Sequence, residues 1–199
     1  MQALDTPTRD RLLAIASDLF YRKGLSGARM QEIADRAGIN KAMLHYYFKS
    51  KEQLFETVFQ QALAVFLDGI AQVLNGELPL PQKIEQYVGY TVDALARDPA
   101  VAAFIVHELH QRPERLAAQF GDGRLIDLST FRQQLAAARP LPLAPNAAEH
   151  FFANMVALCV YPVLAQPLLR PLLHKSKPEY RRFLQERKAL VTQLLLQQL

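Results

Sequence analysis

Apolar residues recur along almost the whole chain at the three- and four-residue spacing of amphipathic helices. Leu12, Ile15, Ala16, Leu19 and Phe20 form one such stripe, which predicts a first helix that ends at Gly24. The same spacing predicts further helices at 29–37, 41–48, 50–74, 82–97, 99–111, 125–138, 147–164 and 178–198. Because no stretch shows the strict alternation of a half-buried strand, the pattern predicts an all-α fold of about nine helices.

The two shortest predicted helices, 29–37 and 41–48, lie on either side of a tight turn. Gly38 marks the turn, and Asn40 is placed to cap the second helix. The expected inward residues are Met30, Ile33, Ala34, Ala37, Leu44 and Phe48. Two short helices in this order are typical of a helix-turn-helix, whose second helix enters the DNA major groove.

The signals at the ends of the later helices are equally local. Ser50 with Gln53, and Ser176 with Glu179, have the spacing of capping boxes, so a helix is expected to start at each. The segment 166–178 carries spaced prolines and is expected to connect two helices.

Composition narrows the class of protein. The chain has 199 residues, of which 50% are hydrophobic, and one cysteine, Cys159. A single cysteine forms no intrachain disulfide, which favours a reducing cytosol, and a buried, inert thiol is expected. The N-terminus has no apolar core of a secretory signal, and the run 155–165 is short and broken by Pro162. The chain is therefore expected to be soluble and cytoplasmic, with no membrane partner.

The positive charge is placed unevenly. Residues 1–51 hold nine Lys/Arg and five Asp/Glu, an excess that equals the whole formal net charge of +4. This excess beside the helix-turn-helix favours a polyanionic partner. A solvated basic face explains a charge of this size equally well, so the charge alone decides nothing.

Specific motifs in residues 9–55 resemble the tetracycline-repressor-like (TetR) family of bacterial regulators. They are Leu19-Phe20, Gly24, Ile33-Ala34, Ala37-Gly38-Ile39 and His45-Tyr46-Tyr47-Phe48-Lys49-Ser50-Lys51. The resemblance implies a three-helix head at 1–51 that binds double-stranded operator DNA, and a helical body at 52–199 for ligand binding and dimerisation. One departure is that Ala28 and Arg29 stand where the family has Thr or Ser, which leaves Ser26 as the cap of the second helix.

The side chains expected to touch DNA are those that point away from Leu44 and Phe48, together with residues at neighbouring helix starts. They are Arg29, Gln31, Lys41, Met43, His45, Tyr46, Tyr47 and Lys51. Lys41 is expected at a guanine edge or a phosphate, and Gln31 at a base edge. Met43 is expected at a thymine methyl, and Arg29 and Tyr46 at phosphates. Lys51 is expected to be exposed at a helix N-terminus and to hold a phosphate there. Tyr46, Tyr47 and Met43 also fit a packing role.

A dimer is expected because one head covers only a few base pairs, and two heads then bind sites spaced by turns of DNA. The surplus apolar surface of 147–164 and 178–198 predicts that these two helices form the homodimer contact. By resemblance, an unknown small hydrophobic effector binds in the body and releases operator DNA. The weak candidates for its contacts are Tyr87, Tyr90, Phe104, His107, Phe151 and Met155. Core packing explains each of these residues as well.

Other classes of function are less favoured. His107 and His110 lie three residues apart in His-Glu-Leu-His, without a third ligand nearby, so no metal site and no cofactor are expected. No set of residues with the spacing of a catalytic triad or phosphate loop appears, so an enzyme is not expected. The alternative that stays open is a DNA-binding regulator without an inducer, controlled by a partner or constitutive.

Overall fold

The computed structural model describes residues 6–115, 128–138 and 146–199. These residues form ten α-helices and no β-strand, which confirms the all-α prediction. They fall into two compact units. The first, called the head unit here, contains residues 6–64 and 103–115, and the second, the body unit, contains the other described residues.

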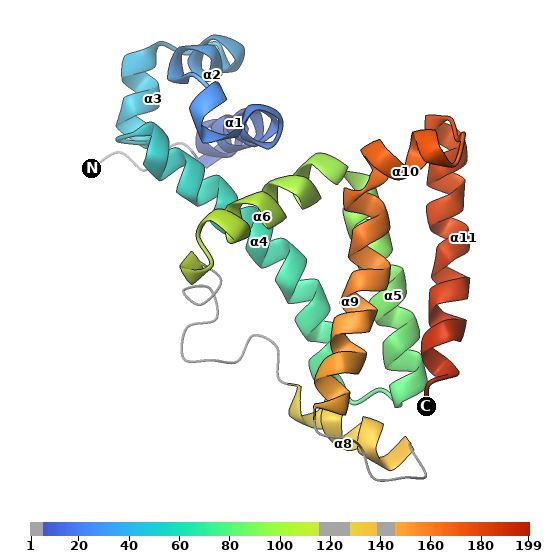
Figure 1. The fold of residues 1–199 in the computed structure, drawn as a ribbon. Coiled ribbons are helices and arrows are strands. Elements are labelled where there is room, and N and C mark those ends of the chain that lie inside the picture. The colour runs from blue at the N-terminus through green and yellow to red at the C-terminus, as the bar shows by residue number, and fades with distance from the viewer. Residues whose placement is uncertain (1–5, 116–127, 139–145) are drawn as a thin grey trace. The chain divides into compact units, whose positions relative to one another are not determined.

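The head unit is built from the three N-terminal helices and parts of two further helices (Figure 1). Their bounds are α1 Thr6–Gly27, α2 Met30–Ala37, α3 Lys41–Tyr47, α4 Lys51–Asn75 and α6 Pro99–Gln111. The predicted inward residues of α2 and α3 are all buried. Because α4 and α6 each contribute residues to both units, the head is more than the N-terminal segment of the chain.

Glycine conformations set the ends of two helices in the head. Gly24 has φ 65° and ψ −177°, which interrupts the regular helix where its end was expected, although a further helical turn continues to Gly27. Gly38 adopts φ 65° and ψ 31° after α2, a left-handed conformation that a side chain disfavours. These angles fix the direction in which the chain leaves each helix.

Side-chain caps then start α3 and α4. The Asn40 side chain accepts a hydrogen bond from the Met43 amide at 2.7 Å, as predicted. Ser50 Oγ accepts from the Gln53 amide at 3.1 Å. The prediction for Ser26 is wrong, because Arg29 occupies the N-cap of α2 and no side chain caps that helix.

An aromatic cluster forms much of the head core. The ring centroids of Phe20 and Phe55 are 5.0 Å apart, and those of Phe55 and Phe104 are 5.4 Å apart, both edge-to-face. Phe59 and Tyr21 also lie against Phe104, at 6.0 and 5.1 Å. Edge-to-face pairs are favourable beyond the area that they bury, so this cluster joins α1, α4 and α6 firmly.

The body unit is organised around α5, which contacts both α9 and α11 (Figure 1). Its helices are α5 Leu80–Arg97, α8 Ser129–Ala138, α9 Ala147–Leu164, α10 Gln166–Leu172 and α11 Lys177–Leu196. Ser176 and Glu179 form the predicted capping box at the start of α11. Residues 116–127 and 139–145, which include the start of the helix expected at 125–138, lie outside the described residues.

The segment 166–178 differs from its prediction. Its first part forms α10, so the described residues contain one helix more than expected. Pro167 lies in the first turn of α10, where a backbone N–H would have no helical partner, and its fixed φ suits a helix start. For the same reason Pro81 is tolerated near the start of α5, which begins two residues earlier than the pattern indicated.

Two helices, α4 and α9, are long and apolar enough to cross a membrane by length and composition. In the structure, buried residues of α9 such as Phe151 and Met155 belong to the core of the body unit. Buried residues of α4 likewise belong to the head and body cores. Core helices of soluble proteins have the same composition, so this property by itself does not indicate a span.

Candidate nucleic-acid interface

Among the three N-terminal helices of the head unit, α3 has one face open to solvent. Leu44 and Phe48 hold it to the core at 0% and 2% exposure. Its other face carries Lys41, Met43, His45 and Tyr46, all exposed, with Tyr46 at 69%. A short exposed helix held by one apolar edge has the shape that enters a major groove.

The charges of the head fall into two groups. Asp18 and Glu32 lie within 3.4 Å of Arg22, Lys23 and Arg36 and form ion pairs with them. Within the described ranges, no carboxylate pairs with Arg29, Lys41 or Lys49, all of which are exposed. The unpaired cations flank α2 and α3, so the positive potential is concentrated around the exposed face of α3.

Lys49 is a further candidate DNA contact. It lies in the motif that resembles the TetR family, but it was not among the contacts expected from the sequence. Its ammonium is free of any ion pair to described residues, while its backbone is fixed between α3 and α4. The Lys49 amide donates to Gln53 Oε1 at 3.0 Å, and its carbonyl lies 3.3 Å from His45 Nδ1. The adjacent α4 cap was the available signal, because it places Lys49 just outside a helix N-terminus.

Lys51 differs from its prediction in one respect. It stands at the first position of α4 as expected, but it is half-buried rather than fully exposed. Its Nζ donates to the Ala28 carbonyl at 3.4 Å, which is long for a hydrogen bond. The charge of Lys51 therefore lies near the start of α4, and no carboxylate in the described part of the chain pairs with it.

Three other predicted contacts have partners within the head. Gln31 is exposed, and its amide donates to Asp35 Oδ1 at 2.8 Å, a bond that must break before Gln31 reaches a base. Tyr46 and Tyr47 form an edge-to-face pair with centroids 5.7 Å apart. Tyr47 is half-buried, so packing accounts for part of its surface, whereas Tyr46 is open to solvent.

Residues 12–58, which include this whole surface, match the family described as bacterial regulatory proteins, tetR family. This match covers the helix-turn-helix segment and does not extend to the body unit. Curated relatives agree with the match. The chain is 32% identical over 105 residues to the transcriptional repressor NicS of Pseudomonas putida, which is 52% of this chain and 50% of NicS. It is also 32% identical over 111 residues to the transcriptional activator FasR of Mycolicibacterium smegmatis, 56% of this chain and 51% of FasR.

The chain thus spans about half the length of the curated tetR-family relatives it matches. The fold is also similar to solved structures over nearly the whole chain. One is the transcriptional regulator FadR from Bacillus subtilis in complex with stearoyl-CoA, with a TM-score of 0.62 at 14% identity, covering 92% of this chain and 97% of FadR. At that identity the similarity shows a shared fold, and it includes the body unit.

The predicted effector contacts do not form one group. Tyr87, Phe151 and Met155 are at most 2% exposed and lie in the core of the body unit. Phe104 and His107 belong to the head unit. Tyr90 is half-buried in the body unit, where its hydroxyl donates to the Val65 carbonyl at 3.1 Å and its ring occupies the space left by Gly69.

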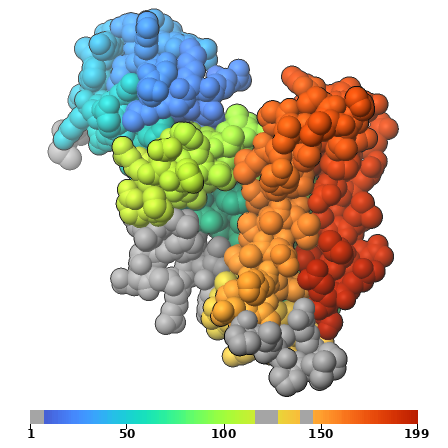
Figure 2. Space-filling view, viewed as in Figure 1, coloured from blue at the N-terminus to red at the C-terminus, as the bar shows by residue number. Residues whose placement is uncertain are grey.

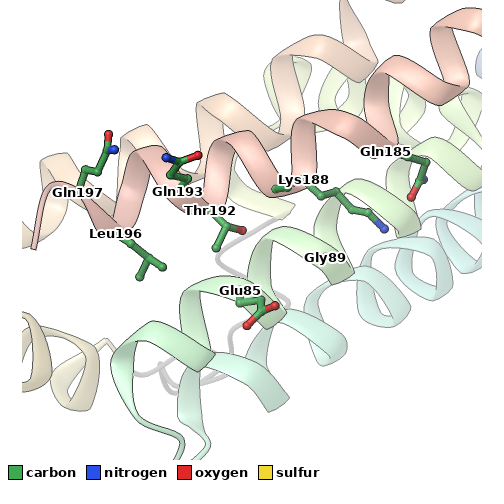
Figure 3. Close-up of a pocket in the computed structure, with 9 residues that line it drawn as sticks. Glu85, Gly89, Gln185, Lys188, Thr192, Gln193, Leu196 and Gln197 are labelled. Carbon is green, nitrogen blue, oxygen red and sulfur yellow. The ribbon is translucent and has the colours of Figure 1, made fainter.

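The body unit has a surface groove of about 780 Å³ between α5 and α11 (Figure 3). Thr192 and Leu196 point from α11 toward α5, and Glu85 faces them from α5, whereas Gln193 and Gln197 point away. None of the predicted effector contacts lines this groove. Beside it, burial acts to raise the pKa of Asp93, but hydrogen bonds from Gln185 and Lys188 and the Lys188 charge outweigh burial and keep this pKa below its usual value.

Arg115, just after α6, is the residue in the head that sequence reasoning missed. It is 8% exposed, and its guanidinium pairs with Glu108 at 2.7 Å and Glu56 at 2.9 Å. The guanidinium also lies over the rings of Phe59 and Phe55, at 4.9 and 5.7 Å. Glu56 is 59 positions away from Arg115 in the chain, so no local sequence pattern predicts this ion pair. Arg115 fixes the end of α6 to α4 within the head unit.

Cys159 is 1% exposed on α9, and burial raises the pKa of its thiol to about 12, with Arg187 opposing the shift. At neutral pH almost no thiolate forms, and the thiolate is the reactive species. We expect native protein to react with Ellman's reagent at least about a hundredfold more slowly than protein in denaturant. Equal rates in the two states, measured by absorbance of the released thionitrobenzoate, would contradict the buried position.

Proposed function

We propose that the chain is a sequence-specific, DNA-binding transcriptional regulator that acts in the cytoplasm. The observation that carries the proposal is the exposed face of α3, surrounded by Arg29, Lys41 and Lys49 without ion pairs to described residues. Unpaired cations around a groove-sized helix fit a phosphate backbone on either side of the bases. The relatives NicS, a repressor, and FasR, an activator, support regulation of transcription. Of the two signs, we propose repression.

The roles within this surface follow from chemistry and exposure. Lys41 and Gln31 are proposed to read base edges, and Met43, at 46% exposure, to contact a thymine methyl. His45 and Tyr47 are proposed to donate to bases or phosphates. The proposed phosphate contacts are Arg29, Tyr46, Lys49 and Lys51. The functional division at residues 51 and 52, between DNA-binding head and effector-binding body, is part of the same proposal.

We expect Lys51→Ala to weaken binding about equally for all DNA sequences and to reduce the slope of log affinity against log salt by about one unit. The reason is that Lys51 contacts a phosphate, which is the same in every sequence. Fluorescence anisotropy with labelled duplexes over a range of salt concentrations measures both quantities.

Lys177→Ala is the matched control, because Lys177 is an exposed lysine at the first position of a different helix, α11. The Lys177→Ala variant should have the same DNA affinity and the same salt slope as the unaltered protein. Lys41→Ala should instead change the order of preference among sequences. An unchanged salt slope in Lys51→Ala would show that Lys51 does not contact a phosphate.

The body is proposed to form a homodimer through residues 147–164 and 178–198. α9 and α11 lie side by side on one face (Figure 2). Within these ranges, Tyr161, Leu190 and Leu194 are exposed to solvent at 57%, 62% and 45%. In and directly after α10, which lies between the two ranges, Leu168, Leu172 and Leu173 are also exposed, at 43–64%. Apolar surface of this extent marks contact sites, and a twofold axis would cover it on both copies.

A small hydrophobic effector is proposed to enter the body core beside Tyr87, Phe151 and Met155. FadR, of similar fold, was solved with stearoyl-CoA, which supports an acyl chain as the type of effector. The effector would release DNA by binding one of two conformations more tightly. The closed packing around Tyr87, whose ring lies 6.3 Å from Phe152, favours the second candidate, a regulator with no inducer.

Selection of bound duplexes from a random DNA pool tests the proposal. We expect an enriched inverted repeat whose half-sites are spaced by whole turns of DNA. Recovery of no enriched sequence would reject sequence-specific binding. Adding stearoyl-CoA to the complex then separates the two candidates, because release of the duplex supports an acyl effector and unchanged binding excludes this ligand.

A further inference from the structure

The head unit contains a hollow of about 880 Å³ between the end of α1, the start of α4 and the second half of α6. Its volume lies within the range of small-molecule sites, about 300–1,000 Å³. All of its lining residues belong to the head unit, so its shape depends on this unit alone. Neither the DNA surface nor the body core accounts for it.

The floor of the hollow is aromatic and firmly held. Phe20 and Phe104 line it at 0% and 5% exposure, and both pack edge-to-face against Phe55. Tyr21, half-buried, lies against Phe104 with centroids 5.1 Å apart. Because Phe20 and Phe104 are almost inaccessible, Tyr21 offers the ring surface that a planar ligand can contact without reorganising the core.

The rim of the hollow is charged, and some of that charge is already neutralised. Lys23 pairs with Glu32, and Arg115 pairs with Glu56 and Glu108. Lys51 and Arg112 line the same hollow and form no ion pair to described residues. Exposed His107 adds a further donor, and Glu52 is the one acid of the rim left without such a pair in the described part of the chain. Because Arg115 has one charge and two glutamate partners, the charges named here sum to zero. Lys51 and Arg112 are the rim cations left for a ligand.

We propose that this hollow binds an aromatic organic anion, with its ring against Tyr21 and its acidic group between Lys51 and Arg112. A neutral ligand would leave both cations without a partner, whereas a carboxylate, sulfonate or phosphate pairs with them. The proposal adds a site in the head to the body site proposed above. It rests on the proposed DNA binding only for its consequence, since the ligand and a DNA phosphate compete for Lys51.

Anilinonaphthalene sulfonate, an aromatic anion, is a suitable probe, and uncharged N-phenylnaphthylamine is its neutral counterpart. Calorimetric titration of the full chain should give a Kd for the anion that rises about threefold to fivefold in Arg112→Gln, the range of one exposed ion pair. Arg181→Gln, which alters an exposed arginine of α11, should leave this Kd within about twofold. Binding of the neutral probe should be the same in all three proteins.

A second variant tests the hollow by filling it. Ala103 is exposed and lines the hollow, so Ala103→Trp places a ring inside it without altering the core. We expect this variant to lose the part of the anion binding that Arg112→Gln weakens. Equal anion binding by the unaltered protein, Arg112→Gln and Ala103→Trp would place the probe elsewhere and overturn the proposal.

The consequence is measured separately with the selected duplex. The anion should raise the Kd for DNA in the unaltered protein and in Arg181→Gln, and have less effect in Ala103→Trp. If the chain binds no DNA but the anion titrations behave as expected, the proposed regulatory function is contradicted and the proposed anion site is supported. If DNA binds and the titrations show no dependence on Arg112 or Ala103, the proposed anion site is contradicted and the proposed regulatory function is supported.

Discussion

Replacing Arg115 with methionine is expected to lower the free energy of unfolding of the head unit by about 3 kcal/mol. The loss arises because Glu108, whose side chain is only 13% exposed, keeps its charge without the guanidinium 2.7 Å away. The value lies at the low end of the range for broken buried pairs because Glu56 is 42% exposed and is rehydrated. Urea unfolding followed by circular dichroism measures the change, since the chain has no tryptophan to report it.

Arg112→Met is the matched control for this prediction. Arg112 lies three positions earlier, is exposed and has no carboxylate partner within the described residues, so its loss should stay within about 0.5 kcal/mol. Adding Glu56→Gln and Glu108→Gln to Arg115→Met should restore part of the stability, because the unpaired negative charges are gone. Equal losses in Arg112→Met and Arg115→Met would show that the buried network contributes nothing specific.

The double replacement Leu190→Glu with Leu194→Glu is expected to convert the protein to a monomer and to weaken operator binding by at least about 100-fold. The two leucines lie one turn apart on α11 and are 62% and 45% exposed, so their apolar area is available to a second copy. Glutamates there would bring like charges together at the twofold axis. With one head per particle, the gain from binding two half-sites at once is lost.

Sedimentation velocity at micromolar concentration and a gel shift on the selected duplex measure the two effects. Val65→Glu is the control, because Val65 is 72% exposed on α4, outside the proposed contact. It should sediment and bind DNA as the unaltered protein does. A double variant that stays dimeric would exclude this face of α11 from the interface.

Local patterns were sufficient for most of the head. The motif around Gly38 and Asn40 gave the turn, the cap and the inward residues Leu44 and Phe48, because each of these depends on partners within four positions. The same reasoning gave the capping box at Ser176. It failed at 166–172, where spaced prolines suggested a connection, although a proline in the first turn of α10 is compatible with a helix.

The candidate site was predictable to a smaller extent. Side-chain exposure on α3 followed from its period, and the unpaired state of Arg29, Lys41 and Lys49 required knowing which cations Asp18 and Glu32 attract. Two of these ion pairs, Lys23 with Glu32 and Arg36 with Asp18, form between α1 and α2, at distances that the sequence does not contain. Phe104 and His107 illustrate the same limit, since α6 contributes them to the head and its earlier residues to the body.

The all-α class, the helix-turn-helix and most helix bounds follow from the amino-acid sequence, because periodicity and caps act over a few residues. The pairing of Arg115 with Glu56 and Glu108, and the half-buried position of Lys51 beside an aromatic hollow, follow from the folded chain. Burial and ion pairing depend on groups brought together from α1, α4 and α6. Their free energies are set by distance and desolvation in the folded chain, which no local pattern encodes.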